Sequence, residues 1–228
     1  MNSDTRFPRL FIMIVDYILP LPLTVLMYVL WLARTGEAWF SAYTLALGIA
    51  FGYILPGIGT NLLGLWEFNG PLRIGRYCVH HGFMYAPYFS LTLYACYGAG
   101  GDLGAAGVIA VIVVCALVQG FLSTLHDLQG LRSGFIRIYS RKSREGAGPE
   151  AIALDYGPVG FSLCAGAYAF SCIMARRFLA ESQIGTLLLF LLLTAIGVSL
   201  MGATTIPYLI KERESIGSAW RKEAHDGR

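Results

Sequence analysis

Long apolar stretches constrain the fold of this chain more than any other feature of its sequence. About 20 apolar residues suffice to cross a hydrocarbon core of about 30 Å. Six such runs can be placed, at residues 10–33, 41–66, 77–99, 103–126, 156–175 and 184–210. Only 14% of the residues are charged and the mean hydropathy is +0.59, which is too apolar for a soluble domain. The sequence therefore predicts an all-α, polytopic membrane helical bundle of about six transmembrane helices, with residues 1–228 as a single integral membrane domain.

The basic residues predict an orientation for this bundle. With six runs, both termini and the second and fourth loops share one side, and of the 17 lysines and arginines only Arg34, Arg176 and Arg177 fall on the other. Basic residues concentrate on the cytoplasmic side of membranes, so we expect both termini to be cytoplasmic. The same bias explains the net charge of +3 without a nucleic-acid partner. The first run is too long for a signal peptide and lacks a small-residue cleavage site.

Residues 127–155 form the one sizeable loop, on the cytoplasmic side, and a polar tail covers residues 211–228. The first part of the loop either continues the fourth helix or lies in the interface with Phe135, Ile136 and Ile138 facing the lipid. The stretch REGAGPE within the loop has the composition of a turn.

Ionisable residues gather in the cytoplasmic half of the predicted bundle. Asp16 lies about 9 Å into the first run at 1.5 Å per residue, where a carboxylate without a partner is costly. His126, His81 or an arginine of the second loop could be that partner. The other candidates lie near the cytoplasmic ends of four further runs. The predicted catalytic set is Glu67, Asp16, His81, His126, Asp127 and Asp155.

Helical spacing places polar residues on shared faces. His81, Tyr85, Tyr88 and Thr92 recur every three or four residues, as do Gln119, Ser123 and His126, while Tyr53, Thr60 and Glu67 stand seven apart. A polar face directed at lipid is energetically unfavourable, so we expect these faces to line one interior cavity. The predicted substrate-binding residues are Tyr53, Asn61, Trp66, Asn69, Tyr85, Tyr88, Gln119 and Ser123.

Prolines within the runs support a cavity with irregular helices around it. Pro20 has no N–H for the carbonyl of Asp16, and Pro56 has none for that of Gly52. Such carbonyls are tolerated in a membrane where protein or a wet pocket satisfies them.

Simpler roles remain open for several of these residues. Glu67, Asp127 and Asp155 could be solvated near headgroups, and Asp155, just before Tyr-Gly-Pro, could be a helix N-cap. His80 is expected to be only the neighbour of a functional His81, because adjacent helical positions point about 100° apart. The tyrosines could equally belong to an interfacial aromatic belt.

The motifs that the chain lacks narrow its chemistry. A glycine-rich phosphate loop, a three-ligand zinc pattern and a GxSxG elbow are missing, and four histidines are too few for a membrane di-iron oxygenase. The five cysteines are odd in number and lie within the runs, which indicates small buried hydrophobes. We therefore expect no metal and no cofactor, and a site that works by acid–base chemistry.

Carboxylates and imidazoles in a partly dry pocket can act as a matched acid and base, and the aromatic residues around them can stabilise a passing cation. These features predict an enzyme that protonates an epoxide or alkene of a hydrophobic isoprenoid or other lipid and removes a proton at the end. Glu67, beside the apolar Trp66, is the expected general acid. Asp16 or His81 would hold or deprotonate the cation, with His126 and Asp127 orienting them.

The stretch NLLGLWEF, residues 61–68, resembles a motif of the membrane-integral terpene cyclases of fungal meroterpenoid and indole-diterpene pathways. Those small all-helical proteins have an Asn…Trp-Glu signature near the same point of the chain. The resemblance implies that Glu67 protonates an epoxide on a polyprenyl substrate. It covers about ten residues, and the spacing from Asn to Trp differs by two. The family also has seven spans and a second acidic residue in the last span, where this chain has none.

Two other classes of function compete with an enzyme. A b-type cytochrome or quinone-binding subunit could use His80 or His81 together with His126 as axial ligands, although haem would leave Asp16 and Glu67 unexplained. An ion or small-molecule transporter could use the same carboxylates as an ion site, although the outer leaflet has no matching polar groups. The chain would lie in the endoplasmic reticulum membrane if eukaryotic and in the inner membrane if bacterial, and its oligomeric state is open.

Overall fold

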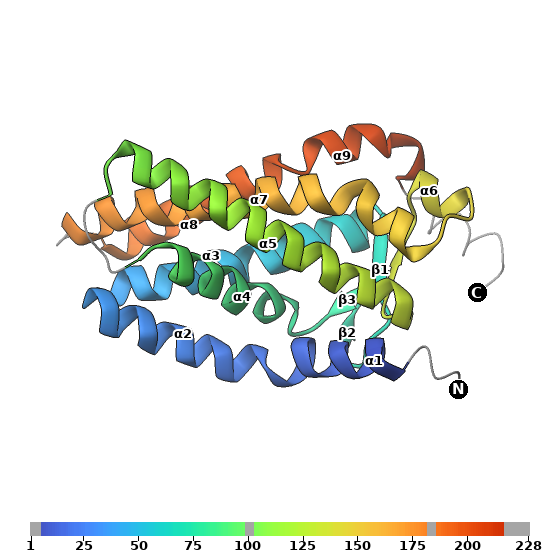
Figure 1. Ribbon diagram of the computed structural model, residues 1–228, viewed down its shortest axis with the longest axis horizontal. Helices are drawn as coiled ribbons and strands as arrows, with labels where there is room; N and C mark the ends of the chain where they lie inside the picture. The colour runs from blue at the N-terminus through green and yellow to red at the C-terminus, as the bar shows by residue number, and fades with distance from the viewer. Residues whose placement is uncertain (1–5, 99–102, 182–185, 217–228) are drawn as a thin grey trace.

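The computed structural model describes residues 6–98, 103–181 and 186–216, and these form an elongated bundle of helices (Figure 1). The helices along its length are α1 (Arg6–Ile12), α2 (Pro20–Thr35), α3 (Ala38–Gly57), α4 (His81–Cys96), α5 (Ala105–Ser133), α7 (Pro149–Glu181) and α8 (Thr186–Ala203). Shorter helical segments are η2 (Met13–Ile18), η3 (Ile58–Leu62), α6 (Arg141–Arg144), α9 (Ile206–Lys211) and η4 (Arg213–Ser215). Each of the six predicted apolar runs contains a helix, which confirms the all-α class.

The number of helices that can cross a membrane is smaller than expected from the sequence. Within the described residues, four helices are long and apolar enough, or five if the pair Arg6–Ile18 and Pro20–Thr35, bent by 51°, counts as one span. Helix α4 has 16 residues and is thus about 24 Å long, which is short of a hydrocarbon core of about 30 Å. It is nevertheless a full member of the bundle, packed against α2, α3 and α5.

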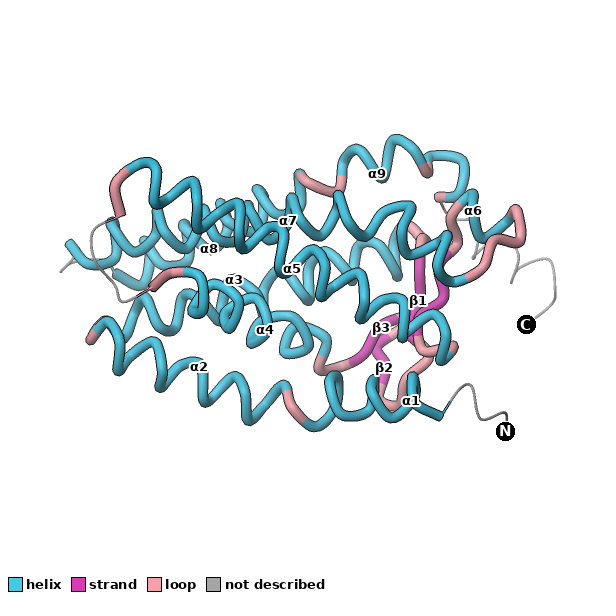
Figure 2. The backbone as a smooth tube through the Cα atoms, viewed as in Figure 1, coloured by secondary structure: helices cyan, strands magenta, loops and turns pink. Residues whose placement is uncertain are grey.

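Short strands cover one end of the bundle, where the sequence predicts none, and we call them the strand cap (Figure 2). Strand β1 (Trp66–Phe68) pairs antiparallel with β4 (Ile136–Ile138), and β2 (Arg73–Ile74) pairs with β3 (Tyr77–Cys78). The predicted runs 41–66 and 77–99 are therefore too long on this side, since η3 ends at Leu62 and α4 begins at His81. Pairing with a distant strand satisfies the backbone groups of these residues, which local sequence cannot reveal.

The loop 127–155 is more ordered than its composition suggests. Helix α5 continues to Ser133, which agrees with the first of the two expectations, and Phe135, Ile136 and Ile138 are buried. Helix α7 begins at Pro149, earlier than the predicted start at residue 156, and so Asp155 lies inside a helix and is not an N-cap. Most of the predicted tail lies outside the described residues.

Small residues allow α3 and α4 to pack backbone against backbone. A Cβ at Gly48 would lie 2.6 Å from the Cα of Ala86, and one at Gly52 would lie 2.8 Å from the Cα of Gly82. Residues this small let helices in a membrane approach closely, which gives van der Waals contact along the interface. The spacing of four residues on both helices keeps the small positions on one face.

A π-helical turn brings Asp16 into the bundle. In η2 the Leu19 N–H bonds to the carbonyl of Ile14, five residues back, instead of to Val15. In this register the N–H that would serve the carbonyl of Val15 belongs to Pro20, which has none, so this carbonyl is left for another donor. The Tyr88 hydroxyl donates to this carbonyl at 2.5 Å, which ties the broken first span to α4.

The end opposite the strands is closed by packing. Trp31 is fully buried and its ring meets those of Phe40 and Tyr97 edge-on. Arg176 of α7 donates to both carboxylate oxygens of Glu37 at 2.9–3.1 Å. Helices α1 and α9 both lie at the strand-covered end (Figure 1), which is the arrangement expected if the two termini share one side.

Candidate functional site

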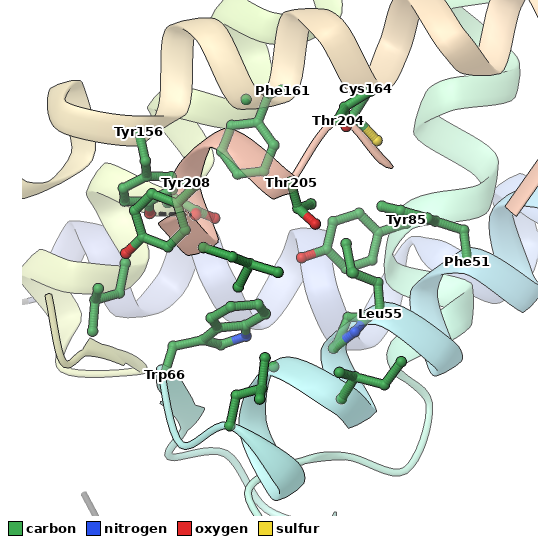
Figure 3. Close-up of a pocket in the computed structure, with 18 of the residues that line it drawn as sticks. Phe51, Leu55, Trp66, Tyr85, Tyr156, Phe161, Cys164, Thr204, Thr205 and Tyr208 are labelled. Atoms are coloured by element: carbon green, nitrogen blue, oxygen red, sulfur yellow. Dashed lines mark hydrogen bonds between the residues drawn. The ribbon is translucent and has the colours of Figure 1, made fainter. Parts of the chain in front are cut away.

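An aromatic cavity of about 140 Å³ lies near the strand-covered end of the bundle (Figure 3). Strand β1 contributes Trp66, α4 contributes Tyr85 and Phe89, α7 contributes Phe161, and α9 contributes Tyr208. Figure 3 shows the rings of Trp66, Tyr85, Phe161 and Tyr208 directed into the space between these elements. The walls are almost entirely apolar, and among the lining residues only Asp127 carries a charge. Such a cavity suits a hydrophobic ligand held by ring faces.

Four polar side chains form a hydrogen-bonded chain that reaches this cavity, and we call it the carboxylate–imidazole chain. The Tyr156 hydroxyl donates to Asp127 Oδ2 at 2.6 Å. Asp127 Oδ1 lies 3.2 Å from His126 Nδ1, and His126 Nε2 lies 2.8 Å from Asp16 Oδ1. Three elements, η2, α5 and α7, thus bring together residues that are far apart in the sequence. The predicted partnership of Asp16 with His126 is present in the structure.

The carboxylate–imidazole chain is mostly buried, with the His126 side chain 22% and the Asp127 side chain 12% exposed. Each contact between an imidazole nitrogen and a carboxylate oxygen needs one hydrogen between the two atoms. The two contacts of His126 therefore hold two protons, either both on the ring or one on the ring and one on a carboxyl group. Asp16 is 1% exposed, and its Oδ2 is buried with no hydrogen-bond partner among the residues that the structure describes. A proton can pass along these contacts towards Asp127, which borders the cavity.

A second cavity, of about 210 Å³, lies on the other side of Asp127, and we call it the α5 cavity. Gln119, Ser123 and His126 of α5 line it together with Tyr88 and Thr92 of α4. Both cavities share the residues Tyr85, Phe89, Asp127 and Phe161 in their walls. The expected polar faces of α4 and α5 thus meet at one interior space.

Glu67 lies outside both cavities and belongs to the strand cap. It stands opposite Arg137 in the β1–β4 ladder, and its Oε1 accepts hydrogen bonds from Arg137 Nη1 at 3.1 Å and from the Tyr139 hydroxyl at 2.8 Å. Burial first, and then the bond to Glu67, raises the pKa of Tyr139, so the tyrosine keeps its proton and remains a donor. The third polar face is not formed, since Glu67 is on a strand.

His81 is completely buried among aromatic rings. Its ring centroid lies 4.3 Å from that of Phe68 and 5.1 Å from that of Tyr85, and both of these rings line the aromatic cavity. Neither ring nitrogen has a hydrogen-bond partner among the described residues. His81 thus supports the cavity wall from behind and is separate from the carboxylate–imidazole chain.

The remaining predicted residues have structural contacts. Asn61 accepts from the Arg76 N–H at 2.8 Å and so holds the β2–β3 hairpin, and Asn69 donates to the carbonyl of Gly134 at 3.1 Å. The Tyr53 hydroxyl donates to the carbonyl of Val79 at 2.9 Å. Asp155 pairs with Lys211 at 2.7 Å, which fastens α9 to α7. None of these four lines either cavity.

Sequence reasoning missed Tyr156, Phe161 and Tyr208. Tyr156 and Tyr208 have adjacent rings, with centroids 5.7 Å apart, and both line the aromatic cavity. Tyr156 lies one residue after Asp155, in a segment expected to be a helix start, and Tyr208 follows Pro207. The signal that could have found them is their position near those ends of the last two runs that were predicted to be cytoplasmic, where the ionisable residues also gather.

The described residues contain no group of three His, Cys, Asp or Glu side chains placed to hold a metal ion. No protein-family model, no curated protein and no solved structure matches the chain.

Proposed function

We propose that this chain is a membrane-embedded enzyme that converts a hydrophobic isoprenoid or related lipid into an isomer by acid–base chemistry, in the manner of a terpene cyclase and without a cofactor. The observation that carries the proposal is the position of Asp127. Among the described residues that line the aromatic cavity it is the one with a charge, and it is also a member of the carboxylate–imidazole chain, which can supply and take back a proton.

The roles follow from what each group can reach. Asp127 delivers a proton, drawn from His126, to a terminal alkene or epoxide of the bound lipid. Asp16 stabilises the imidazole side of the chain, and Tyr156 orients the carboxyl group through Oδ2. The faces of Trp66 and Phe161 stabilise the cation as a neighbouring double bond attacks it. A proton lost from carbon at the end returns to Asp127, so the reaction is a net isomerisation.

The contacts of Glu67 argue for a structural role and against the role of general acid. Its carboxylate holds Arg137 and Tyr139 across the strand cap, and it lines neither cavity. The Trp-Glu motif therefore contributes Trp66 to the cavity and Glu67 to the cap beneath it.

The geometry is less favourable to the two other classes. Both ring nitrogens of His126 are within hydrogen-bond distance of carboxylates, so neither is free to be an axial ligand of haem. The far end of the bundle is closed by the packed rings around Trp31 and by the pair between Glu37 and Arg176, which opposes a transport path along the bundle.

The test compares membranes containing the wild-type chain with membranes containing Asp127→Asn, which keeps the shape but cannot deliver the proton. Farnesyl and geranylgeranyl derivatives that end in an alkene or an epoxide are supplied, and products of unchanged mass and altered retention are measured by chromatography and mass spectrometry. Turnover should fall by about a hundredfold or more. Glu150→Gln is the matched control, because Glu150 forms an exposed ion pair with Arg132 away from the cavities. Wild-type turnover in Asp127→Asn would refute the assignment.

A further inference from the structure

The α5 cavity contains hydrogen-bond donors that the described residues leave unused. Thr92 donates to Gln119 Oε1 at 2.6 Å, and Gln119 Nε2 donates to Ser123 Oγ at 3.0 Å. Gln119 thus uses one of its two N–H groups, and the hydroxyl hydrogen of Ser123 has no acceptor within the described part of the chain. A serine hydroxyl and an amide can each donate further. Two donors therefore face a cavity without a protein acceptor.

These donors lie deep in the bundle. Gln119 is at the centre of the 29-residue α5, about 21 Å from either end at 1.5 Å per residue. Gln119 and Ser123 are both buried. Unused polar groups at such a depth are unfavourable, because hydrocarbon has nothing to accept their hydrogens. An acyl chain in the cavity would leave that cost in place, whereas a ligand oxygen would remove it.

The surroundings select a neutral oxygen on an otherwise apolar molecule. Asp16 and Asp127 already place two carboxylates against one imidazole beside the cavity, so an anionic headgroup would be repelled. The remaining wall is apolar and includes Leu91 and Leu122, whose side chains are exposed on the surface that lipid would cover. A molecule with an apolar body can therefore approach from the bilayer.

We propose that the α5 cavity binds the oxygen-bearing end of a neutral amphiphile, an alcohol or ketone, through Ser123 and Gln119. The identification of this amphiphile as the substrate rests on the proposed function. The cavity shares Tyr85, Phe89, Asp127 and Phe161 with the aromatic cavity, so the bound oxygen lies beside the carboxylate–imidazole chain. The substrate class is thus an oxygenated lipid and not a plain hydrocarbon.

The test uses three photoreactive probes of equal chain length that carry a diazirine: a long-chain alcohol, the hydrocarbon without the hydroxyl group, and the corresponding fatty acid. The purified full-length protein in lipid nanodiscs is irradiated with each, and labelled peptides are identified by mass spectrometry. The alcohol should label residues 11–15 and 119–126 about fivefold to tenfold more than the hydrocarbon or the acid, which is the effect of about one hydrogen bond.

Ser123→Ala should reduce labelling by the alcohol towards the level of the hydrocarbon, because one of the two donors is lost. The matched control is Ser199→Ala, because Ser199 is exposed on α8 and, within the described part of the chain, donates to the carbonyl of Ala195 in its own helix. A melting curve for each variant shows that it is folded. Equal labelling by alcohol and hydrocarbon, stronger labelling by the acid, or an unchanged Ser123→Ala would overturn the inference.

The two proposals fail in different ways, because labelling requires no turnover. Preferential labelling by the alcohol in a protein that converts no isoprenoid would keep the binding site and refute the proposed enzyme. If turnover depends on Asp127 but the alcohol and the hydrocarbon label the protein equally, only the inference about the α5 cavity is refuted.

Discussion

The substitution Glu67→Gln separates a structural from a catalytic role for this residue. Glutamine keeps the size of the side chain and an oxygen that can accept from Tyr139, but it removes the negative charge. In the wild type, Oε1 accepts from Arg137 at 3.1 Å and from Tyr139 at 2.8 Å, and the Arg137 side chain is 63% exposed. The change therefore weakens the β1–β4 cap and leaves both cavities untouched.

The magnitude follows from these two contacts. An ion pair with so exposed an arginine contributes about 0–1 kcal/mol. The bond from Tyr139 changes from charge-assisted to neutral, which costs about 1 kcal/mol. We expect a total loss of about 1–2 kcal/mol in the free energy of unfolding, or roughly 2–8 °C in Tm for a chain of this length. Turnover should remain within about threefold of the wild type.

The assay measures thermal melting of the purified protein in detergent and isomer formation in membranes, for Glu67→Gln and Asp127→Asn side by side. A loss of a hundredfold or more in turnover is expected for Asp127→Asn only. A hundredfold loss of turnover for Glu67→Gln at an unchanged Tm would contradict the structural role of Glu67 and return the role of general acid to this residue.

Three further predictions concern orientation, packing and access. Cysteine introduced by Gly148→Cys should react with an impermeant maleimide from the cytoplasmic face, and labelling only from the opposite face would reverse the predicted orientation. Gly52→Ala should lower the free energy of unfolding by about 1–3 kcal/mol in melting curves, because the added Cβ would lie 2.8 Å from the backbone of α4. Gly202→Ala is the control, because Gly202 has open space around it. Equal Tm values for the two variants would contradict the close packing. Lys211→Met removes the 2.7 Å bond that fastens α9 to α7, so N-ethylmaleimide should label Cys164, in the cavity wall, about twofold to fivefold faster. Unchanged labelling of Cys164, or an equal increase at the other native cysteines, would argue against α9 as the cover of the cavity.

Much of the fold could be predicted because apolar run length alone constrains a chain in lipid. A backbone in hydrocarbon must satisfy its own hydrogen bonds, so each long run becomes a helix. The faces of α4 and α5 follow from helical spacing, and Tyr88, Thr92, Gln119 and Ser123 do line one cavity. The need of Asp16 for a partner was also predictable, since the cost of a lone carboxylate depends only on its depth.

Contacts between distant segments could not be predicted in the same way. Glu67 faces Arg137 because β1 pairs with β4, 70 residues further along the chain, and no periodicity in either segment encodes that pairing. In η2, likewise, the carbonyl of Val15 accepts a hydrogen bond from the Tyr88 hydroxyl, which belongs to another helix, α4. In both cases the backbone groups have several possible partners, and only the assembled bundle selects one.

The site shows the same division between local and long-range causes. Sequence position placed most of the candidate site residues near one end of the bundle, because charges are costly in its apolar middle. Which carboxylate borders the aromatic cavity depends on the angle at which α5 meets α7, since that angle brings Tyr156 within 2.6 Å of Asp127. Side-chain packing sets such angles through the summed contacts of many residues. The sequence therefore limits which carboxylates can border the cavity, and the tertiary packing places Asp127, the proposed acid, in its wall.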